Sequence, residues 1–399
     1  MKKVIISLAM LIASHVMKAQ STWIVCNSPT ITKLESVWMP DINKVLVGGD
    51  NGTLFMSTDY GVTFTPIALG STEDINALYF FNSSHGIMLL GSNFLESTDG
   101  GSNWNFISNV PGDAKSFYFL NQDTGFVGCD FGVALSTYNG GITWNTLTTG
   151  VSERLDAVFF KHIGDGFFGG RNNTSLRTFN QGQSFTTNVI PANGDVKDIQ
   201  FVNATNGFSC GDNGEVLFTS DGGNTWLAQT TPNTNTDMNA LHFTDALNGW
   251  CSGEAGTMFH TTNGGTTWFN DITNTVNEIN NVHLFDNTHG FAVCDNGTII
   301  RLGNGTTAIT ENQDQEINYQ LSPNPFSDHS DLSFQLDKSE SIEILIYDVT
   351  GKKIKDITSR DFSKGLHQVK IEGDQIPAGV YECRIKAGEK VTSVKIVVQ

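Results

Sequence analysis

Short apolar runs alternate with turn-forming residues along most of the chain, and no stretch shows the 3.6-residue period of a surface helix. Each run is followed by a glycine next to an apolar residue, then by a tight turn and another apolar run. The first runs of successive units lie at 77–80, 117–119, 157–160, 199–201 and 240–243. This pattern predicts repeated units of four short β-strands separated by turns.

Six octets occupy the same place in successive units, and the octet at 219–226 reads Thr-Ser-Asp-Gly-Gly-Asn-Thr-Trp. The aromatic residues that close the octets are 40, 40, 41, 41 and 42 residues apart: Phe64, Trp104, Trp144, Phe185, Trp226 and Trp268. A four-stranded unit that repeats about every forty residues is typical of a β-propeller blade. We therefore predict an all-β fold in which the blades bury one another's faces around an axis.

The two ends of the repeat region supply parts of one blade. A seventh unit begins at 282–285 and runs to the strand at 298–300, but no octet with a closing aromatic follows it. The missing strand occurs at 21–25, which resembles 224–228 and places Trp23 41 residues before Phe64, in phase with the repeat. We predict a seven-bladed propeller over 20–308, closed by the N-terminal strand so that no strand edge is left exposed.

The segments before and after the repeat differ from it in composition. Lys2 and Lys3 precede an apolar run at 4–13 and a small residue, Ala19, which predicts a signal peptide at 1–19. The run is too short to span a bilayer, no cysteine follows the cut to carry a lipid anchor, and no later stretch predicts a transmembrane segment. Polar residues dominate 309–318, as expected of a linker.

The formal net charge is −18, and most of it lies in the repeat region. Residues 21–308 contain 9 basic and 26 acidic side chains, a difference of −17. Such a surface repels nucleic acid and anionic membranes but is compatible with basic partners or divalent cations. The six cysteines form no CxxC pair, and Cys129, Cys210, Cys251 and Cys294 follow the repeat, so we predict small buried side chains. We predict no metal site and no cofactor.

The octets resemble Asp boxes, which are also called BNR repeats and connect the third and fourth strands of a blade. Their third position can accept backbone N–H groups within the turn, their fifth-position glycine can take positive φ, and their aromatic can pack between blades. Because six copies related by rotation cannot line one active site, we assign a structural role to the third-position residues: Asp59, Asp99, Asn139, Asn180, Asp221 and Asn263.

The turn between the second and third strands carries the candidate binding residues. Five of the seven copies begin with an acidic residue: Asp50, Asp130, Asp212, Glu254 and Asp295. In a propeller this turn lies on the face opposite the Asp boxes, where the central channel commonly binds ligands. The five residues predict an acidic rim that binds a cation or a basic partner. The alternative is that Asp-Asn-Gly simply forms a good hairpin turn.

The sequence gives little support for catalysis. Asp boxes occur in sialidases, but none of the four arginines of the repeat region lies in that family's Arg-Ile-Pro motif, and the negative charge would repel sialic acid. Serine-hydrolase, P-loop and zinc-protease motifs are absent. A glycoside hydrolase acting on neutral polysaccharide needs only two carboxylates about 5–10 Å apart, so it remains the alternative function. We assign no catalytic residue.

The units as a whole, such as 201–226, resemble the photosystem II assembly and stability factor propellers, and the resemblance covers 21–308. It implies a non-enzymatic binding propeller whose target is a protein or a glycan. That family relies on a basic patch, which this acidic sequence does not share, so the photosystem partner is not carried over.

The end of the chain resembles the type IX secretion C-terminal sorting domain over 319–399. The resemblance rests on Leu-Ser-Pro-Asn-Pro-Phe at 321–326, the hairpin residues Gly-Lys-Lys at 351–353 and the closing strand at 394–398. Alternating apolar positions predict a small antiparallel β-sandwich. The resemblance implies export to the periplasm through the signal peptide, recognition by the type IX machinery, and release or attachment at the outer-membrane surface.

Overall fold

The computed structural model describes residues 22–303 except 188 and 234, and residues 319–398 except 323–325, 337, 349–351, 374–375, 378 and 388–389. The predicted signal peptide at 1–19 and the predicted linker at 309–318 lie outside the described residues. The chain divides into two compact units, Met1–Thr307 and Ala308–Gln399, and each is described by itself.

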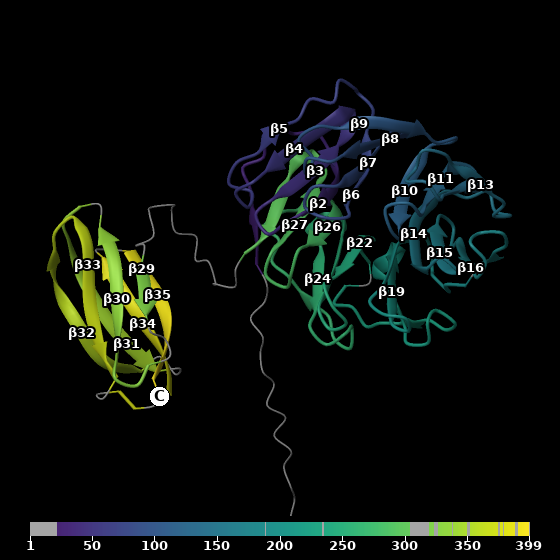
Figure 1. Ribbon diagram of the computed structural model, residues 1–399. Helices are drawn as coiled ribbons and strands as arrows, with labels where there is room; N and C mark the ends of the chain where they lie inside the picture. The colour runs from purple at the N-terminus through teal and green to yellow at the C-terminus, as the bar shows by residue number, and fades with distance from the viewer. Residues whose placement is uncertain are drawn as a thin grey trace, which may run out of the picture. The chain divides into compact units, whose positions relative to one another are not determined.

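The first unit contains seven antiparallel four-stranded sheets arranged in a ring (Figure 1), which confirms the predicted seven-bladed propeller. Blades 1 to 3 comprise β2 (Leu34–Trp38), β3 (Val45–Gly49), β4 (Thr53–Ser57) and β5 (Thr65–Pro66); β6 (Ile75–Phe80), β7 (Gly86–Leu90), β8 (Asn93–Ser97) and β9 (Asn105–Asn109); and β10 (Ala114–Phe119), β11 (Gly125–Cys129), β12 (Ala134–Thr137) and β13 (Asn145–Leu147). Blades 4 and 5 comprise β14 (Leu155–His162), β15 (Asp165–Gly170), β16 (Ser175–Thr178) and β17 (Thr186–Thr187); and β18 (Val196–Phe201), β19 (Gly207–Gly211), β20 (Val216–Thr219) and β21 (Leu227–Ala228). Blades 6 and 7 comprise β22 (Met238–Phe243), β23 (Gly249–Gly253), β24 (Met258–Thr261) and β25 (Phe269–Asn270); and β26 (Ile279–Leu284), β27 (Gly290–Cys294), β28 (Ile299–Leu302) and β1 (Trp23–Val25).

The N-terminal strand β1 is the outer strand of blade 7. It pairs antiparallel with β28, so that Trp23 lies opposite Leu302 and Val25 opposite Ile300. The backbone N–H of Trp23 also donates to the carbonyl of Ile272 in blade 6, at 2.7 Å. In Figure 1 the purple strands of blade 1 lie beside the green strands β26 and β27, and β2 contacts both of them. The ring is therefore closed between the two ends of the repeat region.

The hydrophobic core is divided into clusters that lie between neighbouring blades. For example, Leu34 and Val47 of blade 1 pack with Phe291 and Ile299 of blade 7. In six of the seven blades a glycine at or next to the start of the second strand allows close packing: a Cβ on Gly166 would lie 2.2 Å from the ring of Phe160. The four repeat-phased cysteines are buried in this core, as predicted.

The first strand of each blade contacts the first strands of its neighbours, so β2, β6, β10, β14, β18, β22 and β26 form the inner ring. At one end of these strands lie the 3₁₀ turns between the second and third strands: η1 (Asp50–Gly52), η2 (Asp130–Gly132), η3 (Asp212–Gly214), η4 (Glu254–Gly256) and η5 (Asp295–Gly297). At the other end lie the octets, which donate to the turns between the first and second strands, as from Gly222 N–H to the Thr205 carbonyl at 2.8 Å. We call the two sides the rim face and the octet face.

The second unit contains two antiparallel sheets, with strand orders β29-β30-β33 and β32-β31-β34-β35. The strands are β29 (Tyr319–Ser322), β30 (His329–Leu336), β31 (Glu340–Asp348), β32 (Lys353–Phe362), β33 (Gly365–Glu372), β34 (Gly379–Ala387) and β35 (Lys390–Val398). Phe334 and Ile371 from the first sheet share a buried core with Ile344 and Ile385 from the second. The unit is a small β-sandwich, as predicted.

Candidate functional site

The octets form the same hydrogen-bonded turn in six blades. In blade 5 the Thr219 hydroxyl donates to Asp221 Oδ1 at 2.8 Å and accepts the Gly223 N–H at 2.9 Å. Asp221 Oδ1 also accepts the N–H of Thr225 at 2.9 Å. The equivalent contacts link Thr137, Asn139 and Thr143 in blade 3, so an amide oxygen serves as well as a carboxylate. These bonds explain why the first, third, fifth and seventh octet positions are restricted.

Each third-position residue serves its own turn. The hydrogen bonds to Asp59 lower its pKa to about 2, the largest contribution coming from the Thr63 hydroxyl, and those to Asp99 lower its pKa to about 2, led by Asn103. The six residues Asp59, Asp99, Asn139, Asn180, Asp221 and Asn263 lie on six different blades and do not converge on one point.

The five residues of the predicted rim begin the five 3₁₀ turns of the rim face, one on each of five blades: Asp50, Asp130, Asp212, Glu254 and Asp295. Three of them lie near basic side chains: Lys197 Nζ is 3.1 Å from Asp212, whereas Arg154 and Lys33 are 3.9 Å from Asp130 and Asp295. Burial and the neighbouring carboxylate of Asp74 raise the pKa of Asp50. In the part of the chain that the structure describes, no three His, Cys, Asp or Glu side chains are grouped to hold a metal ion.

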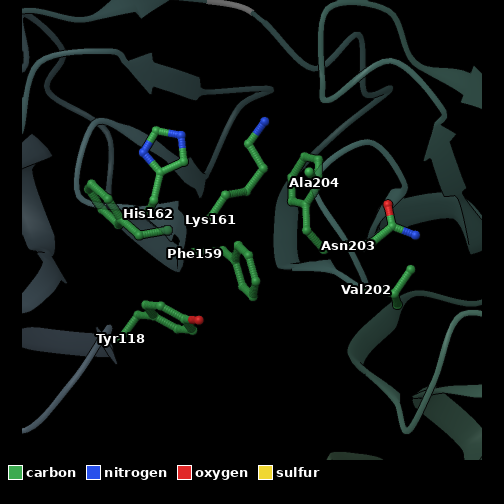
Figure 2. A pocket seen from close by; sticks show the side chains of 9 residues that line it. Tyr118, Phe159, Lys161, His162, Val202, Asn203 and Ala204 are labelled. Carbon is green, nitrogen blue, oxygen red and sulfur yellow. The ribbon is translucent and has the colours of Figure 1, made fainter.

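A pocket of about 380 Å³ opens on the octet face, between blades 3, 4 and 5 (Figure 2). Its lining residues come from the ends of β10, β14 and β18 and from the turn after β18: Tyr118, Phe159, Phe160, Lys161, His162, Phe201, Val202, Asn203 and Ala204. The rings of Tyr118 and Phe159 are 4.7 Å apart, and those of Phe159 and Phe201 are 5.7 Å apart. The pocket therefore has an aromatic wall and polar groups at its edge.

A buried ion-pair network fixes the polar edge of this pocket. Lys161 Nζ lies 2.5 Å from Asp165 Oδ2 and donates to the Gly222 carbonyl at 2.8 Å. Arg177 donates to both oxygens of Asp165 at 3.0 Å. Burial alone would raise the pKa of Asp165, but the hydrogen bonds from Arg177 and Lys161 outweigh it and lower the pKa. Lys161 is thus held in place, but it shares the carboxylate of Asp165 with Arg177, so these three side chains together carry one net positive charge.

Other titratable groups lie on the inner ring. Burial lowers the pKa of His242 to about 4 and that of His283 well below its usual range, and the two rings are 4.6 Å apart. Burial raises the pKa of Asp198 to about 6, although the backbone N–H groups of Leu241 and Ile199 donate to its carboxylate. Both histidines are neutral at pH 7.

A buried polar contact anchors the closing strand. Trp23 Nε1 donates to Asp271 Oδ2 at 3.0 Å, and Asp271 Oδ1 lies 2.5 Å from His260 Nδ1. The side chain of Asp271 is completely buried. Neither His260 nor Asp271 belongs to an octet, so the repeat pattern gave no sign of this contact. It gave no sign of the pocket either, because nothing in the repeat separates Tyr118 and Phe159 from the residues that pack between blades.

Comparison with protein families supports both parts of the chain. Residues 179–273 match the model described as photosynthesis system II assembly factor YCF48, and residues 320–399 match the secretion system C-terminal sorting domain. None of the curated proteins matches the chain. The chain therefore carries a BNR-repeat propeller followed by a type IX sorting tail.

Solved structures show the same propeller fold. YCF48 bound to D1 peptide is 18% identical, with a TM-score of 0.61 over 73% of this chain and 98% of that one. YCF48 from Cyanidioschyzon merolae is 20% identical, with a TM-score of 0.59 over 71% of this chain and 98% of that one. The WD40 β-propeller domain of Doa1 is 13% identical, with a TM-score of 0.59 over 73% of this chain and 98% of that one. At these identities the likeness establishes the fold alone.

Proposed function

We propose that this chain is an exported binding propeller whose target is a protein, bound at the pocket between blades 3, 4 and 5. The type IX sorting tail implies secretion. Within the described residues, no helix has the length and apolar character needed to cross a membrane. The finer route, in which a signal peptide at 1–19 delivers the chain to the periplasm and the tail directs it to the outside or the cell surface, is part of the proposal.

The observation that carries the binding proposal is the make-up of the pocket. Protein-binding sites are enriched in aromatic residues, with polar groups around them that fix orientation. Tyr118, Phe159 and Phe201 provide the aromatic part, and Lys161, His162 and Asn203 the polar part. One solved propeller of the same fold holds a peptide, which supports a polypeptide as the ligand class.

The alternative of a glycoside hydrolase finds no support at this pocket. Hydrolysis of a glycosidic bond requires two carboxyl groups on either side of the scissile bond. None of the nine residues that line the pocket is Asp or Glu. Release of reducing sugar from neutral polysaccharides by the purified full-length chain would favour the hydrolase and contradict our proposal.

A photo-cross-linking experiment tests the binding site in cells. Ala204 is an exposed residue that lines the pocket, and Ala246 is exposed at the equivalent position of the next blade, in the turn after β22. A benzophenone amino acid is placed at 204 or at 246 in the full chain, and irradiated cells are analysed by mass spectrometry. We expect one defined polypeptide adduct from 204 and none from 246. Equal adducts from both positions, or no polypeptide adduct from 204, would refute the proposed site.

Export is tested separately from binding. Residues 319–399 are fused to a periplasmic reporter that carries its own signal peptide, in a host with the type IX machinery. We expect the reporter to appear outside the cell or on its surface, and a reporter without the tail to remain periplasmic. A fused reporter that stays in the periplasm would contradict the sorting role of the tail without affecting the binding proposal.

A further inference from the structure

The turn between the first and second strands of a blade, on the octet face, has the same hydrogen bonds in six blades. In blade 5, Asn203 Oδ1 accepts the N–H of Thr205 at 2.9 Å and that of Asn206 at 2.8 Å. Short polar side chains favour this turn because they can bond to the backbone two and three residues later. The six residues that accept in this way are Asp41, Asn82, Asn121, Asn203, Asp245 and Asp286.

Blade 4 departs from this pattern, and it does so beside the pocket. His162 takes the place of the Asn or Asp, and its Nδ1 accepts the Gly164 N–H at 3.2 Å. Lys161 precedes it, and both line the pocket. The other six blades have an uncharged residue at the position of Lys161: Pro40, Phe81, Leu120, Val202, Thr244 and Phe285. Departures from a local rule of the fold are expected at functional sites, so this turn marks the pocket as one.

The polar side chains at the edge of the pocket present hydrogen-bond donors. Because Nδ1 of His162 accepts an N–H, Nε2 carries the ring proton and donates. Asn203 uses its oxygen within its own turn, which leaves its NH₂ group to donate. The ammonium of Lys161 has three N–H groups, of which Asp165 and the Gly222 carbonyl accept two. The matching ligand group is therefore rich in acceptors.

The charge at this edge favours an anionic acceptor. Lys161 and Arg177 share the carboxylate of Asp165, which leaves one net positive charge, and none of the nine lining residues is Asp or Glu. The Lys161 side chain is only 10% exposed, and its ammonium lies 5.0 Å from the centre of the Phe201 ring. An ion pair is stronger in such surroundings than in water. A carboxylate of the ligand would balance the charge.

The acidic character of the whole propeller does not cancel this local preference. Residues 21–308 contain 26 acidic and 9 basic side chains, and their combined field repels an acidic ligand at long range. At physiological ionic strength, charges more than about 8 Å apart are largely screened. A carboxylate in contact with Lys161 is well inside that distance. The local donors therefore decide which group is bound, whereas the overall charge slows the approach of an acidic partner.

The aromatic wall adds a second requirement. Figure 2 shows Lys161 and His162 on one side of the pocket and Asn203 on the other, with the rings of Phe159 and Tyr118 below. These rings and that of Phe201 offer apolar surface, whose burial contributes about 25 cal/mol per Å². A carboxylate alone would leave this surface exposed to water. The ligand should therefore carry an apolar group next to its carboxylate.

We infer that the pocket binds a polypeptide segment in which an Asp or Glu side chain lies next to an aromatic or large aliphatic side chain. This inference deepens the proposed function and depends on it. The carboxylate accepts hydrogen bonds from Lys161, His162 and Asn203, and the apolar side chain packs on Tyr118, Phe159 and Phe201. The apolar contact supplies most of the affinity, and the carboxylate supplies the discrimination against uncharged segments.

The ligand preference is tested by selecting phage-displayed random heptapeptides on the purified full chain, in about 0.15 M NaCl so that distant charges are screened. We expect selected peptides to share an Asp or Glu beside an aromatic residue, Leu, Ile or Met. One selected peptide is labelled with fluorescein and compared in fluorescence anisotropy with its analogue in which Gln or Asn replaces the acid. We expect the analogue to bind about tenfold more weakly. Selection of basic or uncharged peptides, or of none, would overturn the inference.

A lysine variant and a matched control test the contact with Lys161. Lys161→Met removes the ammonium, whereas Lys44→Met removes one that donates to the equivalent octet carbonyl of blade 2, that of Gly100, at 3.0 Å. Thermal unfolding checks that both variants fold. We expect K161M to weaken the acidic peptide about tenfold and the amide analogue less than about threefold, and K44M to change neither. Equal losses for both peptides in K161M would assign a structural role to Lys161 and overturn the inference.

A second pair of variants places the peptide without removing a polar contact. Ala204→Trp fills the pocket from an exposed turn, and Ala246→Trp makes the same change at the equivalent position of the next blade. We expect A204W to abolish binding of the selected peptide and A246W to leave it unchanged. Binding that A204W does not weaken would show that the peptide occupies another surface, and the inference would be wrong.

Failure of the inference can be separated from failure of the proposed function. If cross-linking from position 204 captures a polypeptide but no acidic peptide is selected, the ligand preference is wrong and the proposed function stands. If neither experiment detects a polypeptide, both are wrong. Binding of a uronic-acid oligosaccharide that A204W abolishes, with no peptide bound, would also overturn both, because it would identify the pocket as a site for an acidic glycan.

Discussion

Replacing Trp23 tests whether the N-terminal strand closes the ring. Its side chain is completely buried and packs with Trp250, Met258 and Ile279 at the junction of blades 6 and 7. Truncation of a buried Trp to Ala costs about 3–5 kcal/mol. Loss of the indole N–H also deprives the buried carboxylate of Asp271 of a donor, which adds about 1–3 kcal/mol. We therefore expect Trp23→Ala to lower the free energy of unfolding by roughly 4–8 kcal/mol.

The assay is thermal and urea unfolding of the full chain followed by circular dichroism. For a domain of this size, each kcal/mol shifts Tm by about 2–4 °C, so W23A should lower Tm by roughly 8–32 °C. Trp23→Phe keeps an aromatic ring but loses the donor, and we expect a loss of about 1–3 kcal/mol. Leu227→Ala is the control, because Leu227 lies exposed on β21, the equivalent outer strand of blade 5. A W23A protein as stable as L227A would refute ring closure by β1.

Substitutions at Asp198, at Asp221 and in the Asp165–Arg177 pair test the polar contacts of the propeller by urea unfolding. Burial raises the pKa of Asp198 to about 6, so its contribution to stability is complete below about pH 4 and is lost as pH rises through 6. Asp198→Asn should therefore flatten the dependence of stability on pH. A profile that Asp198→Asn leaves unchanged would contradict the assignment. Asp221→Ala should lower the urea midpoint more than Asp221→Asn, because Asn keeps the side-chain oxygen that accepts the Thr225 N–H, as Asn does in three other octets. Equal losses would show that the turn does not need this oxygen. Asp165→Leu should lower the free energy of unfolding by about 3–5 kcal/mol, because it leaves Arg177 buried without its carboxylate. The double change with Arg177→Leu should recover part of that loss. A double variant less stable than D165L would contradict the argument.

The architecture of the propeller could be predicted because each blade repeats the same local requirements. The closing aromatics from Phe64 to Trp268 keep their spacing, and the hydrogen bonds of the octets show why the first and third octet positions recur from blade to blade. Trp23 stood out as a closing aromatic without its octet, and the structure pairs it with Leu302. A periodic pattern therefore predicts the sheets well, because strands, turns and blade packing depend on the same residues.

The candidate site could not be predicted, because the repeat pattern that predicts the sheets is common to all blades. A repeat shows what the blades share, whereas the pocket is lined by residues from three strand ends and one turn that lie far apart in the sequence. Tyr118 and Phe159 look like ordinary strand residues, and in the inner ring their position is occupied in the other blades by Trp38, Tyr79, Gln200, His242 and His283. The acidic rim on the opposite face stays a prediction: the five residues begin equivalent turns, and Lys33, Arg154 and Lys197 lie beside three of them.

Hydrogen exchange of the full chain with and without its cross-linked partner protein is the most direct test of where this propeller binds. If the pocket on the octet face is the binding site, the partner should protect amides at 118–122, 159–164 and 201–206, while the equivalent segments at 79–85 and 242–248 exchange as before. Protection confined to the rim face, at 50–52, 130–132, 212–214, 254–256 and 295–297, would contradict the account and assign binding to the acidic rim.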